Sequence, residues 1–351
     1  MNLQEHISLA QRTTLGVGGL ARWFVDARTE ADIADAMHFA HEQSLPVFVL
    51  GGGSNLLVSD AGFKGLVLHV QLPGIKQVEP QHDGVLLRAA AGESWDALVQ
   101  FAVDHDLAGM ECLAGIPGTV GGTPVQNVGA YGQEVAETIH SLRCFDTRTS
   151  SFVELSNRDC GFAYRTSLLN TSERGRYVIT RVDFHLSPGG APKLAYADLR
   201  RHFPADSKPS LTEVAEAVRT IRRAKGMVVD PADPNSRSAG SFFRNPVISN
   251  DVLPLLAEGT GVALDNIPNW PAGDGSKKLP AAWLLERAGF VRGYTLGRAG
   301  ISAKHTLALI NRGDATAGDI VALRDRIIAT VQERFGIQLE QEPVSVGAET
   351  R

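Results

Sequence analysis

Cysteine is scarce in this 351-residue chain, which has only Cys112, Cys144 and Cys160. They form no C-x-x-C pair and their number is odd, which is typical of a protein in a reducing cytosol. The first residues have neither the basic segment nor the apolar core of a signal peptide, so we expect a cytoplasmic protein. Positive charge is also in deficit. The net charge of −5 argues against a nucleic-acid partner, because phosphate binding needs a concentrated positive field.

Metal-ligand clusters and a P-loop are absent from the sequence as well. His38 and His41 have i, i+3 spacing on a predicted helix, but no acidic or cysteine cluster accompanies them, and we expect no metal site. No G-x-x-x-x-G-K-[ST] pattern occurs. The uncharged stretch 112–133 contains two prolines, scattered glycines, Gln126 and Asn127, a composition that argues against a membrane span.

Glycine is the residue in excess, with 36 copies, where an average share is about 7%. One glycine-rich window, Gly51–Asn55, lies between two apolar, strand-like runs, and by itself fits either a tight turn or a cradle for an anion. The uncharged stretch 112–133 is the second window. Because every glycine costs conformational entropy, two such loops favour a site for a long ligand such as FAD, with its pyrophosphate on backbone amides.

The stretch Gly16–Ala21 imitates a dinucleotide fingerprint by its letters, G-x-G-x-x-A. That fingerprint needs a strand before it and a helix after it, so that the helix N-terminus faces the pyrophosphate. Here a polar segment precedes the glycines and a strand-like run, Trp23–Val25, follows them. We therefore expect no doubly wound nucleotide-binding fold.

The hydrophobic pattern predicts helices and strands without regular alternation, which indicates an α+β fold. Capping boxes at Thr29, Ser210 and Thr316 predict three helix starts, and Ser94 predicts a fourth. The expected helices are 30–44, 94–109, 210–226, 280–288 and 316–336. The expected strands are 65–70, 85–89, a hairpin over 141–156, and 176–186 with its alternation broken at 181/182. We interpret residues 227–240 as a connector.

A series of motifs resembles the UDP-N-acetylenolpyruvoylglucosamine reductase family, in the family's order and over nearly the whole chain. Each motif alone is moderately specific, but the ordered set is highly specific. The motifs are Gly51-Gly-Gly-Ser-Asn55, Ile116-Pro-Gly-Thr-Val-Gly-Gly122, Gln126-Asn-Val-Gly-Ala-Tyr-Gly132, Tyr164-Arg-Thr-Ser167, Ala239-Gly-Ser-Phe-Phe-Arg-Asn-Pro246 and Leu339-Glu-Gln-Glu342.

The resemblance implies a two-part FAD-binding module of the vanillyl-alcohol-oxidase type and a C-terminal α+β substrate-binding domain. The implied boundaries are 1–71 and 72–226 for the FAD-binding subdomains, the second joined by a C-terminal strand at 336–351, and 227–335 for the substrate domain. It also implies non-covalent FAD, with NADPH as co-substrate. The implied FAD contacts are Gly51, Gly52, Gly53, Ser54, Asn55, Ile116, Pro117, Gly118, Gly122, Thr123 and Gln126.

Three residues match the family's catalytic groups. Arg165 corresponds to the arginine that stabilises the anion formed after hydride transfer, a role that suits a permanently charged, planar guanidinium. Ser241 corresponds to the proton donor. Glu342 corresponds to the third group. Pro343, which follows it, departs from the usual pattern of the family and favours extended geometry at Glu342. Glu340 is a weaker competitor for the same role.

The resemblance further implies substrate contacts by Tyr164, Tyr196, Lys225, Asn245 and His305. Lysine and asparagine suit a diphosphate, and a mobile tyrosine at position 196 would close over the sugar nucleotide. Two of these residues have ordinary structural interpretations. A core aromatic would explain Tyr164, and a helix-end cation would explain Lys225.

The implied activity is NADPH-dependent reduction of a UDP-sugar enolpyruvyl ether to UDP-N-acetylmuramate, in peptidoglycan precursor synthesis. Two alternatives remain from the sequence: an FAD-dependent alcohol oxidase of the same fold, and a non-catalytic protein that binds nucleotide sugars. Expected partners are the UDP-sugar and NADPH, with neither nucleic acid nor membrane, and we expect a monomer.

Overall fold

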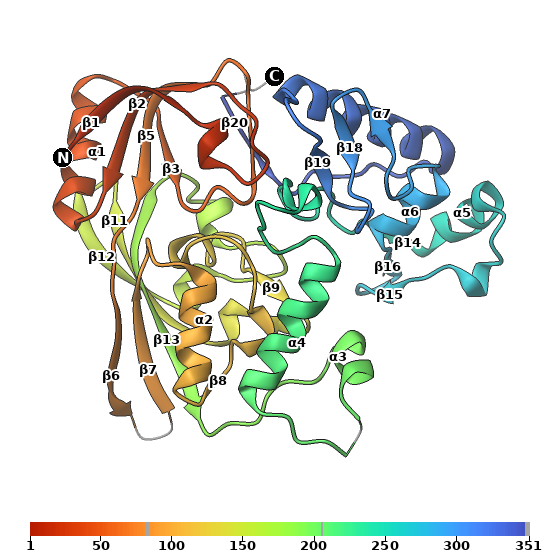
Figure 1. Ribbon diagram of the computed structural model, residues 1–351, viewed down its shortest axis with the longest axis horizontal. Helices are drawn as coiled ribbons and strands as arrows, with labels where there is room; N and C mark the ends of the chain where they lie inside the picture. The colour runs from red at the N-terminus through yellow and green to blue at the C-terminus, as the bar shows by residue number, and fades with distance from the viewer. Residues whose placement is uncertain (82–83, 205, 348–351) are drawn as a thin grey trace. The chain divides into compact units, whose positions relative to one another are not determined.

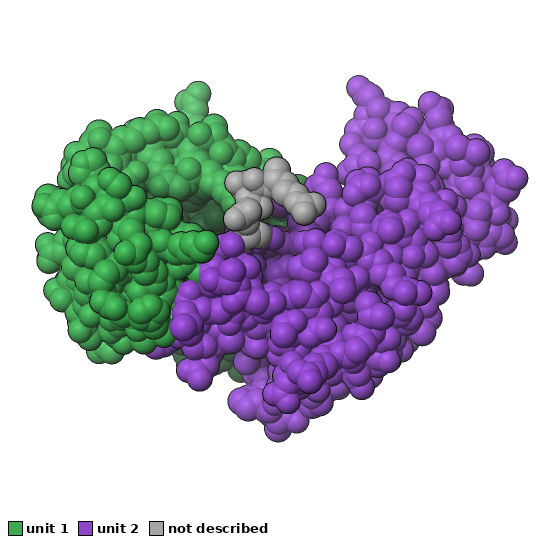
Figure 2. Space-filling model, turned by 90° about the horizontal axis from the view of Figure 1, so that it is seen from above, with its two compact units in different colours: residues 1–7, 21–53, 63–228 green, residues 8–20, 54–62, 229–351 purple. Residues whose placement is uncertain are grey.

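The computed structural model describes residues 1–81, 84–204 and 206–347, and the chain forms two compact units, coloured separately in Figure 2. Unit 1 consists of Met1–Ile7, Ala21–Gly53 and Phe63–Val228; unit 2 consists of Ser8–Leu20, Ser54–Gly62 and the chain from Val229 onward. Each unit has its own hydrophobic core. The three-part division at 71/72 and 226/227 stays a prediction.

The first sheet of unit 1 has the order β1-β2-β5-β3, with β5 parallel to both β2 and β3. A helix, α1, packs against β5 and begins at the predicted capping box of Thr29 and Asp32. The element bounds are β1 Leu3–Ser8, β2 Leu20–Ala27, α1 Glu30–Glu42, β3 Val47–Leu50 and β5 Phe63–Val70.

The second sheet of unit 1 is antiparallel, with the order β12-β11-β13-β7-β6. It contains the predicted hairpin, which is confirmed as β11 and β12. In the pairing of β11 with β13, Arg143 lies opposite Arg181 and Cys144 lies opposite Ile179. Thr180 is therefore an extra residue in β13, a β-bulge that lies next to the predicted break in alternation at 181/182. The bounds are β6 Ile75–Gln81, β7 Gly84–Ala90, β8 Leu107–Ala108 (paired with β13), β11 Ile139–Asp146, β12 Ser151–Ser156 and β13 Tyr177–Pro188.

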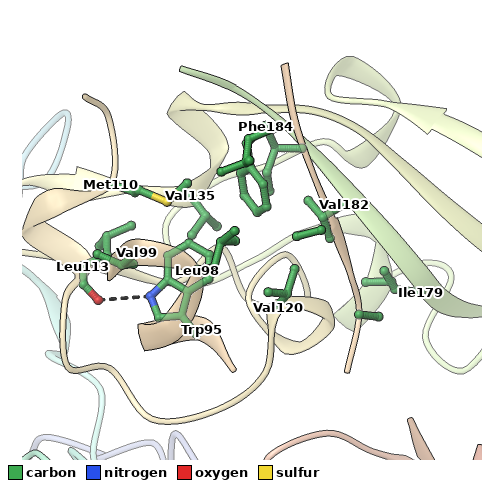
Figure 3. Packing of buried hydrophobic residues seen from close by; sticks show 14 of the residues in the cluster. Trp95, Leu98, Val99, Met110, Leu113, Val120, Val135, Ile179, Val182 and Phe184 are labelled. Atoms are coloured by element: carbon green, nitrogen blue, oxygen red, sulfur yellow. Dashed lines mark hydrogen bonds between the residues drawn. The ribbon is translucent and has the colours of Figure 1, made fainter. Parts of the chain in front are cut away.

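Two helices of unit 1, α2 (Trp95–Asp104) and α4 (Leu211–Ala224), lie side by side (Figure 1). Ser94 caps α2, as predicted, but the helix ends at Asp104 rather than near Gly109, because the chain enters β8 at Leu107. Figure 3 shows Trp95 of α2 packed among buried side chains, with its Nε1 donating to the carbonyl of Leu113 at 3.0 Å. The shorter elements are β9 Gly129–Ala130, β10 Gln133–Glu134 and α3 Ala197–His202.

The described part of unit 2 combines the α-helices α5, α6 and α7 with small sheets. The capping box of Thr316 and Asp319 opens α7, and Gly336, at φ 67°, ends it, as predicted. The bounds are β14 Val247–Ser249, α5 Leu253–Thr260, β15 Trp270–Pro271, β16 Ser276–Lys278, α6 Ala281–Arg287, β17 Thr295–Leu296, β18 Ala299–Ile301, β19 Leu309–Asn311 and α7 Ala317–Phe335.

The C-terminal strand of unit 2, β20 (Val344–Val346), pairs in parallel with β4 (Leu56–Val58). It is shorter than the predicted strand 336–351, whose last four residues lie outside the described residues. Among the residues that the structure describes, no helix is long and apolar enough to cross a membrane.

Candidate active site

The two glycine-rich windows contact each other within unit 1. A Cβ added to Gly52 would lie 2.6 Å from the Cα of Gly118, and one added to Gly51 would lie 2.7 Å from the Oγ1 of Thr119. Only glycine allows the two backbones to approach so closely. Gly52 and Gly122 are exposed, so the joined windows present backbone rather than side chains to solvent. Such a surface fits a cofactor whose pyrophosphate is held by backbone N–H groups.

Backbone hydrogen bonds hold the second window against the start of α2. The N–H of Trp95 donates to the carbonyl of Gly118 at 3.1 Å, and the N–H of Val120 donates to the carbonyl of Glu93 at 2.9 Å. Asp96 accepts from the N–H of Gly115 at 2.7 Å. The hydroxyl of Thr123, a predicted FAD contact, donates to the carbonyl of Val120 at 2.8 Å, so it shapes the loop itself.

The glycines at 16–19 have a packing role in unit 2. A Cβ on Gly18 would lie 2.5 Å from the Cβ of Val58, and one on Gly19 would lie 2.3 Å from the carbonyl oxygen of Asp60. The segment that follows is the strand β2 and not a helix. The expectation that this stretch is no dinucleotide fingerprint is confirmed.

Backbone carbonyls of the second window hold the guanidinium of Arg165. Nη2 donates to the carbonyl of Gly129 at 2.8 Å and Nη1 to that of Asn127 at 3.4 Å. The guanidinium also lies over the ring of Tyr164, with its carbon 5.4 Å from the ring centroid. Tyr164 is 49% exposed, so its interpretation as a core aromatic is wrong. The structure thus brings the Tyr164–Ser167 motif to the Gln126–Gly132 motif.

A second group of predicted substrate residues gathers around Lys225, the C-cap of α4. Its Nζ donates to Oδ2 of Asp198 at 2.8 Å and lies 5.7 Å from the ring centroid of Tyr131. Tyr131 in turn makes an edge contact with Tyr196, at 5.3 Å between centroids. Burial lowers the pKa of Lys225, but the hydrogen bond to Asp198 and the proximity of Tyr131 outweigh it, so the net pKa is raised.

Sequence reasoning missed Tyr131 and Asp198 as members of this group. Tyr131 is 8% exposed, and its burial raises the pKa of its hydroxyl. It lies inside the Gln126–Gly132 motif, which was the available signal. Asp198 lies two residues after Tyr196, and nothing in the local pattern indicates that it would meet a lysine 27 residues away.

In unit 2, the C-terminal segment pairs with the turn that carries Ser241. The N–H of Glu342 donates to the carbonyl of Phe242 at 2.9 Å, and Phe243 and Gln341 form an antiparallel bridge. Phe242 and Phe243 are fully buried, whereas Ser241 is only half-buried. The backbone of Glu342 is thereby held beside the Ser241 turn.

Pro343 lies at a bend between the bridge at Gln341 and the strand β20. The proline needs no donor in the short pairing, and the next N–H, that of Val344, donates to the carbonyl of Asn55 at 2.9 Å. The C-terminal segment therefore joins the Ser241 turn to the end of the first glycine window. Glu342 is half-buried, while its competitor Glu340 is exposed.

The two remaining predicted substrate residues adjoin the same turn. Oδ1 of Asn245 accepts from the N–H of Ala281 at 2.9 Å, at the start of α6. Nδ1 of His305 accepts from the N–H of Leu307 at 3.1 Å, and the carbonyl of Leu307 accepts from the N–H of Phe242 at 2.8 Å. His305 is thereby linked through Leu307 to the Ser241 turn, and Asn245 is linked to the start of α6.

The predicted site residues are divided between the two units, and their joint assembly into one site stays a prediction. Unit 1 contains Gly51, Gly52, Gly53, Ile116, Pro117, Gly118, Gly122, Thr123, Gln126, Tyr164, Arg165, Tyr196 and Lys225; unit 2 contains Ser54, Asn55, Ser241, Asn245, His305 and Glu342.

The described part of the chain contains no group of three or more His, Cys, Asp and Glu residues that could hold a metal ion. His38 forms an exposed ion pair with Glu42 on α1, at 3.1 Å.

Comparison with known families identifies both parts of the chain. Residues 231–346 match the family described as UDP-N-acetylenolpyruvoylglucosamine reductase, C-terminal domain. Residues 21–156 match the family described as FAD binding domain. The second match confirms the predicted FAD-binding module and covers both glycine windows completely.

Individual relatives extend the similarity over nearly the whole chain. A UDP-N-acetylenolpyruvoylglucosamine reductase of Nocardia farcinica is 47% identical over 353 residues, covering 98% of this chain and 90% of the relative. That of Streptomyces coelicolor is 45% identical, covering 97% and 89%. The crystal structure of the reductase from Thermus caldophilus aligns with a TM-score of 0.65 at 27% identity, covering 99% of each chain. The α+β fold is thus confirmed, and the chain belongs to the UDP-N-acetylenolpyruvoylglucosamine reductase family.

Proposed function

We propose that this protein is an FAD-containing oxidoreductase that uses NADPH to reduce the enolpyruvyl ether of UDP-N-acetylglucosamine to UDP-N-acetylmuramate. The observation that carries the proposal is the similarity to reductases of this name over 97–98% of the chain. The reaction would supply peptidoglycan synthesis. Because nucleotide sugars and NADPH are cytosolic metabolites, we propose a cytoplasmic enzyme, acting as a monomer.

The joined glycine windows would hold the cofactor. FAD, when bound, supplies the hydride chemistry that protein side chains lack. The missing side chains of Gly51 and Gly52 let the two windows touch. Asp96, which accepts from the N–H of Gly115, and Trp95, whose N–H donates to Gly118, keep the backbone of the second window in place. A preorganised loop loses little freedom when it binds a ligand.

Arg165 would stabilise the negative charge that develops on the substrate carboxylate. Its guanidinium is already held by two backbone carbonyls, so it need not reorganise when the anion forms. A planar guanidinium matches a carboxylate with two parallel N–H donors.

Ser241 would donate the proton to the carbon next to the carboxylate, with Glu342 assisting. A serine hydroxyl is a poor acid in water, so the proposal requires a neighbour that orients it or returns its proton. The backbone pairing of Glu342 with Phe242 supports a carboxylate in that role, and buried Phe242 and Phe243 exclude water from the base of the turn.

The UDP-sugar would be bound by five residues: Lys225, Tyr196, Tyr164, Asn245 and His305. A lysine ammonium attracts a diphosphate, and amide and imidazole donors add hydrogen bonds. Tyr196 is 46% exposed and lies at the start of α3, where an aromatic ring can cover a ligand.

The two half-reactions separate these roles. We expect Ser241→Ala to leave flavin reduction by NADPH near the wild-type rate. The same change should slow flavin reoxidation by the enolpyruvyl substrate by about 10²–10⁴-fold, the usual contribution of a positioned acid. Anaerobic stopped-flow absorbance measures both rates. Glu342→Gln should act in the same direction, and Glu340→Gln is the matched control in the same segment.

Fast reoxidation in Ser241→Ala would remove the serine from the proposed role. An effect of Glu340→Gln equal to that of Glu342→Gln would show that charge rather than position matters. Rapid reoxidation of the wild type by oxygen and slow reoxidation by substrate would favour an alcohol oxidase. A purified protein without a flavin absorbance band would favour a non-catalytic nucleotide-sugar-binding protein.

A further inference from the structure

Lys225, which the proposed function assigns to the substrate diphosphate, forms an ion pair with Asp198. Lys225 and Asp198 are in contact at 2.8 Å, and their side chains are 36% and 25% exposed. We call Lys225, Asp198, Tyr131 and Tyr196 the Lys225 cluster. All four belong to unit 1 and are linked by the contacts described above.

The backbone of Lys225 is fixed, so only its side chain is free to change partner. Its N–H donates to the carbonyls of Ile221 and Arg222 in the last turn of α4, at 3.2 and 3.1 Å. Buried residues anchor that helix, among them Val214 and Val218, both at 0% exposure. Nε of Arg222 also donates to the carbonyl of Gly115 at 3.1 Å, which ties the end of α4 to the second glycine window.

The segment that carries Asp198 is held in place both before and after Tyr196. Upstream, the N–H of Lys193 donates to the buried carboxylate of Glu111 at 2.9 Å, and the thiol of Cys112 donates to the carbonyl of Lys193 at 3.1 Å. Downstream, Leu199 is completely buried. Asp198 is next to Leu199 and therefore keeps its place when Lys225 leaves.

Asp198 has a second cation nearby. Nη1 of Arg201, one turn further along α3, lies 3.5 Å from its Oδ1. Because Arg201 is an alternative partner, the carboxylate of Asp198 loses little free energy when it releases Lys225. Partly exposed ion pairs are also weak in general.

We propose that Asp198 is an intramolecular competitor for Lys225, which it holds until the substrate diphosphate takes its place. The proposal rests on the assignment of Lys225 to substrate binding. Two anions at one ammonium repel each other, so carboxylate and diphosphate bind there in alternation rather than together. Asp198 thus determines affinity: it keeps Lys225 paired beside Tyr131 in the free enzyme, and a ligand must displace it.

The test measures the Kd of UDP for the flavin-loaded enzyme by titration calorimetry. Removing the competitor in Asp198→Asn should lower this Kd by about three- to fivefold, the range expected for a partly exposed pair. Glu216→Gln is the matched control, because it removes a carboxylate from an exposed ion pair on α4, with Arg223 at 2.7 Å, and should leave the Kd unchanged.

A double-mutant cycle separates competition from general repulsion. In a Lys225→Ala background, Asp198→Asn should have no effect on the Kd of UDP if the aspartate acts through the lysine. A gain in affinity that persists there would mean long-range repulsion and would overturn the proposal. An unchanged or higher Kd in Asp198→Asn alone would also overturn it.

Failure of the underlying assignment has a different signature. If Lys225→Ala by itself leaves the Kd of UDP unchanged, the lysine is no substrate contact and the proposed binding site is wrong at this residue. If Asp198→Asn does not retain flavin, Asp198→Ser at the same position carries the test with the same expected decrease.

Discussion

At the scale of single residues, the candidate cofactor surface depends on missing side chains and on unusual backbone conformations. Asn127, Tyr131 and Arg165 have left-handed φ values of 45°, 48° and 55°. Asn127 and Tyr131 lie in the second glycine window, and Arg165 donates to the carbonyl of Asn127. Non-glycine residues adopt this conformation at a cost, and such residues concentrate at functional sites. Part of the backbone strain is therefore located where the proposed anion-stabilising arginine lies.

Gly52 gives the sharpest prediction at this scale. Its φ is not left-handed, so Gly52→Ala acts only through the added Cβ, 2.6 Å from the Cα of Gly118. We expect a free energy of unfolding lower by about 1–3 kcal/mol, as for other overpacked sites, and weaker retention of flavin. Urea unfolding and the flavin-to-protein absorbance ratio measure the two effects.

Gly318 provides the matched control for Gly52. A Cβ there would lie 3.5 Å from the Oγ1 of Thr316, an ordinary contact, and the residue lies in the first turn of α7. Gly318→Ala should leave flavin binding unchanged, because alanine suits a helix better than glycine. Equal losses in both variants would contradict the steric explanation.

At the scale of elements, a buried ion pair joins the hairpin of β11 and β12 to the start of β13. Both guanidinium nitrogens Nε and Nη2 of Arg176 donate to the carboxylate of Asp146, at 3.0 and 2.7 Å. The residue Asp146 is 2% exposed. These hydrogen bonds lower the pKa of Asp146 from its ordinary 3.8 to about 2.

The lowered pKa predicts a pH dependence of stability. A carboxyl whose folded pKa is below its unfolded value stabilises the fold above the unfolded pKa, and this contribution is lost as pH falls through the folded pKa. Asp146→Asn should therefore lower the free energy of unfolding by about 2 kcal/mol at neutral pH, and the difference from wild type should shrink as pH falls from about 4 towards 2. Urea unfolding across this range measures it.

The exposed Asp325 gives the comparison for this pH effect. It pairs with Arg324 at 2.7 Å, and its side chain is 59% exposed. Asp325→Asn should follow the wild-type curve closely, because exposed pairs contribute little. A constant difference between Asp146→Asn and wild type at every pH would rule out the titration of Asp146 as the cause.

At the scale of the whole molecule, neither unit is continuous in sequence. Segments 8–20 and 54–62 belong to unit 2 with the C-terminal part of the chain, and their residues Leu15, Val17 and Leu57 contribute to its core. Cutting the chain at residue 228 would therefore leave the core of unit 2 incomplete, because these residues would stay in the N-terminal fragment. Stability has to be tested in the intact chain.

Separate cores predict separate local responses. Leu284 is completely buried in the core of unit 2, and Leu284→Ala should lower the free energy of local unfolding there by about 2–5 kcal/mol. Hydrogen exchange followed by mass spectrometry should then show faster exchange in α6 and α7, with the central strands β7 and β13 unchanged. Leu98→Ala in the core of unit 1 should give the reverse pattern. Uniform acceleration in either variant would indicate one cooperative unit.

The sequence alone determined the features that depend on neighbouring residues. Capping boxes predicted the starts of α1, α4 and α7, because the bonding groups lie three residues apart. The ordered motifs predicted the family, which the relatives confirm. Local pattern also rejected Gly16–Ala21 as a nucleotide loop. It placed the end of α2 wrongly, because the sharp entry into β8 follows from pairing with the distant β13.

Only the tertiary structure decided which distant groups meet. It placed Gly52 on Gly118, Glu342 on Phe242, and Lys225 on Asp198. The physical reason is that such contacts depend on how sheets and helices pack, and a residue's local sequence carries no record of a partner many positions away. The glycine composition of the two windows indicated that their backbones lie close to another group. Only the packing showed that this group is the other window.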